Sequence, residues 1–240
     1  MNPYFLLFLY FPFSAFAQTD TFTIETIETD DPWNKVKFYD LEHYTPYFFE
    51  DENYIVTTKC NGEFGGEVYF DDKMDKTVTI AYSTCPVIIN KHESKYYLTT
   101  SLWHLGGFYS INEISDPKEL SIKSNDSIYQ GRGDLMSGMK VLTGGTGKTI
   151  LLSFKYNDNI YHIVCDHDAS ENYIAIRERA TLKKIQLLNK LPMMTLSNNV
   201  CVTKDSHYAA KFYIQEGNWL RTCYFDIYEN NIKIFLCKRE

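Results

Sequence analysis

The sequence predicts an all-β fold, arranged as a propeller-like array of four to five degenerate, four-stranded antiparallel units. Helical periodicity is nearly absent, and most of the chain consists of β-branched and aromatic runs that end at Gly, Asn or Asp. Four of these runs also repeat one pattern. A β-sandwich or a pair of small β-domains is the alternative, because any antiparallel protein contains strand–turn–strand units.

Each repeated unit consists of a strand led by Tyr, a polar or Gly-rich turn, and a second strand with aromatic residues. The four units begin at Tyr54, Tyr97, Tyr161 and Tyr208. With the strands expected between them, a unit has four short strands in about 45 residues, which is the spacing of β-propeller blades. A four-stranded blade cannot bury both faces alone, so it stacks on its neighbours. A further unit before His43 would raise the count to five.

The strands expected between the repeated pairs cover 77–82, 87–90, 139–142, 149–154 and 193–196. The polar stretch 121–138 is predicted to be an inserted loop. The best match to a helical period is the short segment 181–190, in which Leu182, Ile185, Leu187 and Leu188 are apolar.

Residues 1–17 are predicted to be a signal peptide cleaved after Ala17. The segment has no charged side chain, and its apolar run is followed by Ala15 and Ala17 in the pattern that signal peptidase recognises. An apolar run of about 10 residues is too short to span a bilayer. Gln18 follows instead of a cysteine, so no lipid anchor is expected. The alternative interpretation of 1–17 is a buried N-terminal strand. After cleavage of a signal peptide, residues 18–240 are expected to form one β-domain that is exported to the periplasm or the cell exterior.

The net charge of −7 makes nucleic acid an unexpected partner, because an acidic chain without a stripe of Lys and Arg repels phosphate. No later segment is apolar over the length of a membrane span. No cofactor is implied. The expected partner is a carbohydrate or a protein.

None of the six cysteines belongs to a C-x-x-C pair, so neither a zinc ribbon nor a thioredoxin-type site is indicated. Cys223 and Cys237 flank an expected hairpin with a two-residue turn at 230–231. In that register Phe225 opposes Leu236. Because side chains alternate between faces, Cys223 and Cys237 then point to opposite faces and are predicted not to pair.

Two short motifs resemble functional sites. The segment 144–149 is similar to a phosphate-binding loop, but Leu142 replaces the first glycine and a strand-like run follows, so a hairpin turn is predicted. Arg132-Gly133-Asp134, the tripeptide that integrins bind, falls in the predicted inserted loop. A solvated loop is the simpler interpretation, and Asn125 in the same loop fits the N-glycosylation pattern.

The predicted site follows from the repeat. If the four units are equivalent, their central turns lie on one face and their polar residues approach one another. These candidate binding residues are Glu63, Trp103, His104, Asp166, His167, Asp168 and Glu216.

Two of these turns have distinctive chemistry. Asp166, His167 and Asp168 are ligand types for a divalent cation, but three adjacent residues leave a site incomplete, so a hydrogen-bonded Asx turn is expected and no metal is predicted. Trp103 and His104 stand in a Gly-rich turn, where they could bind a sugar or act as an acid or base.

The leading functional hypothesis is a non-enzymatic, exported binding or scaffold module, since neither a nucleophile elbow nor a zinc-protease motif is present. The first alternative is a carbohydrate-active hydrolase that uses acidic residues in a central pocket. Two carboxyl groups about 5–9.5 Å apart would favour it. The second is a secreted surface or effector protein, suggested by the Arg132-Gly133-Asp134 loop.

Overall fold

The computed structural model describes residues 22–31, 48–104, 106–122, 137–194, 200–202 and 206–238. These residues form four sheets, with short 3-10 turns at Gly62–Phe64 and Pro117–Glu119, and the all-β prediction is confirmed. The described part of the chain contains no helix with the length and apolar character needed to cross a bilayer. The predicted signal peptide at 1–17 lies outside the described residues, as do Asn125 and Arg132-Gly133-Asp134.

The strands are grouped by sheet, each in spatial order. The first sheet contains β2 (Phe49–Glu50), β3 (Tyr54–Cys60), β4 (Gly66–Asp72), β5 (Val78–Tyr82) and β9 (Ser121–Ile122). The second contains β6 (Pro86–His92), β7 (Lys95–Leu102), β8 (Phe108–Ile114) and β10 (Met139–Thr146). The third contains β11 (Lys148–Tyr156), β12 (Asn159–Asp166), β13 (Glu171–Glu178) and β14 (Thr181–Asn189). The fourth contains β15 (Met193–Met194), β17 (Tyr208–Glu216), β18 (Trp219–Tyr228), β19 (Asn231–Cys237) and β1 (Thr23–Thr29), with β16 (Val200–Val202) also paired to β17.

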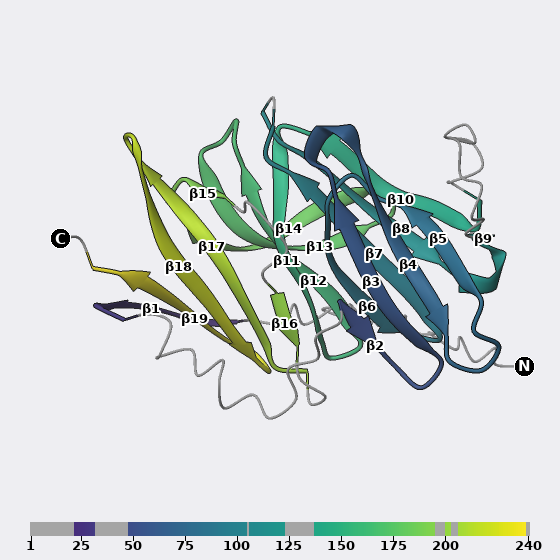
Figure 1. Cartoon of the computed structure of the whole chain (residues 1–240). Helices are drawn as coiled ribbons and strands as arrows, with labels where there is room; N and C mark the ends of the chain where they lie inside the picture. The colour runs from purple at the N-terminus through teal and green to yellow at the C-terminus, as the bar shows by residue number, and fades with distance from the viewer. Residues whose placement is uncertain are drawn as a thin grey trace, which may run out of the picture.

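Each of the four predicted strand–turn–strand units is the central hairpin of one sheet. The hairpins are β3–β4, β7–β8, β12–β13 and β17–β18. The sheets lie side by side, from the first at the right of Figure 1 to the fourth at the left. Within the described ranges they do not close into a ring. The strand β1 starts no fifth sheet there, because it pairs in parallel with β19 and extends the fourth.

The core lies between facing sheets, because the buried side chains of each sheet pack on those of the neighbouring sheet. Val56 and Phe70 of the first sheet pack with Leu98 of the second. Phe154 of the third sheet packs in another cluster with Phe212 of the fourth. Burying one such side chain stabilises the fold by about 1.5–3 kcal/mol. The alternation predicted from sequence therefore determines which sheets meet.

The strand β11 is the edge of the third sheet, yet it is buried between the second and fourth sheets. A buried edge needs partners for its unpaired backbone groups. The N–H of Ile150 donates to Ser101 Oγ at 2.9 Å, and Asn90 Nδ2 donates to the carbonyl of Ser153 at 3.1 Å. Both partners come from the second sheet, so side chains complete the hydrogen bonding of β11.

Tyr208 of the fourth sheet supplies a third partner to the same edge. Its hydroxyl accepts from the N–H of Lys155 at 3.0 Å and donates to Asn90 Oδ1 at 3.2 Å. Tyr208 and Asn90 are both buried. One hydroxyl thus connects the second, third and fourth sheets.

The helical period of 181–190 does not correspond to a helix, because this segment forms the edge strand β14 (Thr181–Asn189). Its pairing with β13 shifts twice, and the extra residues are Ile185 and Leu188. Each β-bulge adds one residue to one strand and so interrupts the period of two. The two bulges therefore produce the helix-like spacing of Leu182, Ile185 and Leu188.

The predicted register of the last hairpin is wrong by two residues. Phe225 lies opposite Ile234 and not Leu236, and the turn consists of Glu229, at a φ of 53°, and Asn230. A shift of two leaves every side chain on its predicted face, so the apolar pattern cannot distinguish the registers. Cys223 and Cys237 are not bonded to each other, as predicted; both are free thiols.

The segment 144–149 does not form the predicted hairpin, since β10 belongs to the second sheet and β11 to the third. Gly147, at a φ of 77°, links them. A strand follows this glycine, so the exclusion of a phosphate-binding loop is confirmed. The predicted inserted loop at 121–138 begins as β9, which returns to pair with β5, and 123–136 lie outside the described residues.

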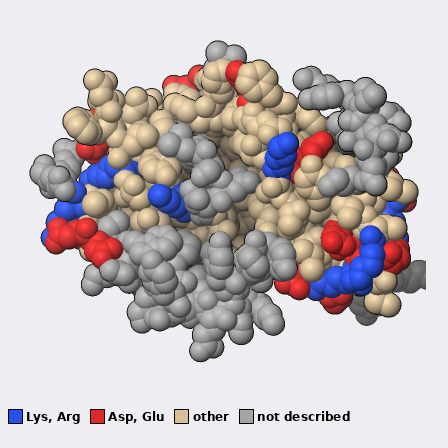
Figure 2. Space-filling view, viewed as in Figure 1, with Lys and Arg blue, Asp and Glu red and all other residues tan. Residues whose placement is uncertain are grey.

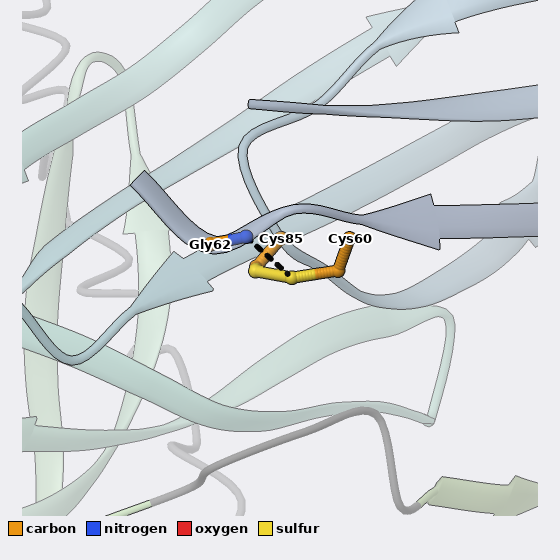
Figure 3. Close-up of a disulfide and its surroundings, with 3 residues drawn as sticks. All are labelled: Cys60, Gly62 and Cys85. Atoms are coloured by element: carbon orange, nitrogen blue, oxygen red, sulfur yellow. Dashed lines mark hydrogen bonds between the residues drawn. A yellow bond between two sulfur atoms is a disulfide. The ribbon is translucent and has the colours of Figure 1, made fainter. Parts of the chain in front are cut away.

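A disulfide joins the first two sheets. It links Cys60, at the end of β3, to Cys85, just before β6, with Cα atoms 4.9 Å apart (Figure 3). The N–H of Gly62 points to Cys60 Sγ at 3.4 Å. The turn that follows β3 is therefore fastened to the second sheet.

We expect Tyr208→Phe to lower the free energy of unfolding by about 1–3 kcal/mol, because it leaves the partly buried Lys155 N–H and the buried Asn90 Oδ1 without this partner. Urea denaturation measures the loss. Tyr213→Phe, on the same strand but only partly buried, is the matched control and should change stability by less than about 0.5 kcal/mol. Equal losses in the two variants would contradict the role given to the Tyr208 hydroxyl.

Stability should also fall as the pH decreases below 6.5. His162 is fully buried, and its Nδ1 lies 2.7 Å from Ser153 Oγ. Burial, with a smaller effect of the Arg177 charge, lowers the pKa of His162 to about 3 from 6.5. The unfolded chain therefore binds one more proton between these pH values, which costs the folded state about 1.4 kcal/mol per pH unit. His162→Gln should flatten the stability profile between pH 6.5 and 5 in chemical denaturation; an unchanged slope would contradict this assignment.

Candidate functional site

The turns of the first three sheets meet through side-chain contacts. His104 Nδ1 lies 2.7 Å from Glu63 Oε2, which joins the β7–β8 turn to the β3–β4 turn. The ring of Trp103 packs edge-on against His167 of the β12–β13 turn, with centroids 4.0 Å apart and planes at 79°. We call Glu63, Trp103, His104 and His167 the turn cluster. All four were predicted from the sequence as site residues.

Backbone hydrogen bonds hold the second and third turns together through Gly147. The N–H of Gly147 donates to the carbonyl of Gly107 at 3.1 Å, and the N–H of His167 donates to the carbonyl of Gly147 at 2.9 Å. Gly107 has a φ of 89°, and a Cβ atom there would lie 2.6 Å from the His167 ring. A glycine is therefore needed where the Trp103 turn passes over His167.

Both ring nitrogens of His167 have neighbours within the cluster. Thr149 Oγ1 lies 3.0 Å from Nε2, and Cys165 Sγ lies 3.5 Å from Nδ1. Burial lowers the pKa of His167, against the opposing charges of Asp166 and Asp168. The imidazole is therefore neutral at pH 7 and provides a packing surface for Trp103.

Cys165 does not have the properties of a nucleophile. Its Sγ donates to the carbonyl of Met193 at 3.2 Å, and burial raises the pKa of the thiol to about 12. A reactive cysteine needs a lowered pKa and access to solvent. Cys165 and His167 therefore form a structural contact and not a catalytic pair.

Asp166 anchors the third turn. Burial would raise the pKa of its carboxyl group, but an ion pair with Lys148 and the N–H of Ala169, at 3.0 Å, outweigh burial and lower it. Lys148 Nζ also lies 3.2 Å from the hydroxyl of Tyr173. The bond to Ala169 confirms the predicted Asx turn. Asp166 is thus a charged, internally satisfied group.

Two predicted residues remain, Asp168 and Glu216. Asp168 is exposed and covers Gly147, where a Cβ atom would lie 2.6 Å from its Oδ2. Glu216, at the fourth turn, forms an ion pair with Arg221 of its own hairpin, at 3.0 Å. The contacts above thus join three of the four turns.

Two contributing residues were not predicted from the sequence. Lys148 and Thr149 follow Gly147, and they contact Asp166 and His167 respectively. In the sequence, the Gly-Lys-Thr string resembles only an incomplete phosphate-binding motif. The unusual composition of this string could have marked it as a site. Its role, however, depends on its position between two sheets, which only the tertiary structure determines.

Over the described ranges, no three His, Cys, Asp or Glu side chains converge in a way that could hold a metal ion. No family model, curated protein or solved structure matches the chain.

Lys148→Met should leave Asp166 buried without its cation. We expect the pKa of Asp166 to rise, because burial then acts without the opposing ammonium group, and the free energy of unfolding at pH 7 to fall by about 1–2 kcal/mol. Carboxyl titration by NMR and urea denaturation measure the two effects. Lys183→Met is the control, because Lys183 and its partner Glu178 are more than half exposed and their pair should be worth little. An unchanged pKa of Asp166 would contradict the pairing.

Proposed function

We propose that this chain is an exported, non-enzymatic binding module in which a propeller-like series of sheets presents the turn cluster to a protein partner. Four sheets of about blade size, each built around a central antiparallel hairpin, support the propeller-like arrangement. Residues 1–17 support export, and the Cys60–Cys85 disulfide is consistent with an extracellular protein.

The observation that best supports binding is the pair of exposed aromatic residues beside the Glu63–His104 contact. Phe64 is 84% exposed and Trp103 is 37% exposed. Each is the sequence neighbour of one residue of that contact, so the two lie on adjoining turns. Exposed aromatic side chains with a polar surround are typical of the residues that dominate protein–protein affinity.

The charge distribution is also compatible with a protein partner. On the face in Figure 2, acidic and basic side chains stand beside one another, and much of the described surface between them carries neither. Such a surface favours contacts of mixed character over attraction to a polyanion.

The hydrolase alternative has less support. A glycosidase needs one carboxyl group with a raised pKa to donate a proton. The pKa of Asp166 is instead lowered, and its carboxylate pairs with Lys148. Glu63 and Glu216 are paired with His104 and Arg221. These carboxylates serve the fold better than they would serve acid catalysis.

The test is capture of extracellular proteins on the immobilised chain, followed by identification and a direct affinity measurement with the purified partner. The double variant Phe64→Ser/Trp103→Ala should weaken that affinity at least tenfold, which corresponds to about 1.4 kcal/mol. Met74→Ser is the control, since Met74 is 86% exposed but lies in the β4–β5 connection, at the other end of β4 from the Phe64 turn.

Two results would oppose the proposal. The first is a partner whose affinity is the same for the wild-type chain and the double variant. The second is glycan hydrolysis that is abolished by Asp166→Asn, since that outcome would establish the enzyme instead.

A further inference from the structure

A pocket of ≈ 430 Å³ lies on the fourth sheet, away from the turn cluster. It is lined by His207, Asp226, Tyr228, Asn231 and Lys233. His207 directly precedes β17, whereas the fourth turn follows the end of β17. A nine-residue strand spans about 30 Å, so the pocket and the turn are at opposite ends of the sheet.

Strand register explains how the pocket forms. Asp226 lies opposite Lys233, and Tyr228 lies opposite Asn231. All four therefore point to one face, which is opposite to the face that buries Phe225 in the core.

Three of the lining side chains are held in position before any ligand binds. His207 Nε2 forms a hydrogen bond with Asp226 Oδ1, and the His207 ring packs against Tyr228 with centroids 5.5 Å apart and planes at 61°. Tyr228 is nevertheless 43% exposed. Preorganised polar groups beside an accessible ring reduce the entropic cost of binding.

We propose that this pocket binds a neutral pyranose sugar. One face of a pyranose carries C–H groups that pack on an aromatic ring, which Tyr228 provides. Its hydroxyl groups both donate and accept, and they match the carboxylate of Asp226, the amide of Asn231 and the ammonium of Lys233. The volume is at the small end of the range for ligand pockets, which suits one or two sugar rings.

The charge of the pocket favours a neutral sugar over an anionic ligand. Lys233 lies between Asp226 on β18 and Glu25 on β1 in the sheet register. One ammonium group beside two carboxylates leaves no excess of positive charge for a phosphate, sulfate or uronate.

The experiment is an NMR titration of the isotope-labelled full chain with methyl glycosides of glucose, galactose and mannose at millimolar concentration, and with glucuronate as the charged comparator. We expect at least one neutral glycoside to shift the resonances of His207, Asp226 and Tyr228. Asp226→Asn, which keeps the side-chain shape, and Tyr228→Ala should each weaken binding at least tenfold. Tyr213→Ala, on the same face but farther along β17, should not.

Three outcomes would overturn the proposal. They are the absence of shifts at the pocket with every neutral glycoside, equal binding by wild type and Asp226→Asn, and stronger binding of glucuronate than of any neutral sugar. None of them bears on the turn cluster, because Phe64 and Trp103 are unchanged in these variants.

Discussion

The hydrogen bonding of β11 is the constraint on which the rest of the structure depends. An edge strand normally faces water, but β11 is enclosed by two other sheets. Its free backbone groups would cost about 1–3 kcal/mol each if they stayed unpaired. Ser101, Asn90 and Tyr208 supply the partners from outside its own sheet. The second, third and fourth sheets can therefore pack closely only in the one arrangement that places these three side chains along β11.

That arrangement also explains why a site forms at the turns. Stacked sheets of the same up-and-down order bring corresponding hairpins to the same end. Trp103 and His167 then meet, and Glu63 meets His104. The sheets place these residues, whereas Gly107 and Gly147 permit the last few ångströms of approach. The cluster is thus assembled by three sheets and does not belong to any one of them.

Much of this could be predicted from the sequence, because strand alternation and turn residues are local signals. The four central hairpins and the grouping of Trp103 with His167 follow from the repeat. The register of β18 and β19 could not be predicted, since a shift of two residues leaves every side chain on the same face of the sheet. The bulges at Ile185 and Leu188 imitated a helical period. The roles of Lys148 and Thr149 depend on the passage from one sheet to the next at Gly147, which no local pattern records.

The disulfide between Cys60 and Cys85 has a consequence for the turn cluster. The turn that contains Glu63 begins directly after Cys60, so the covalent link holds this turn against the second sheet. Reduction removes that link and leaves the first sheet attached by packing and by noncovalent contacts such as the exposed Glu63–His104 pair. The pairing of Glu63 with His104 is therefore coupled to the thiol–disulfide balance of the surroundings. The turn cluster is held most firmly in an oxidising medium, and its Glu63 side is held less firmly in a reducing one.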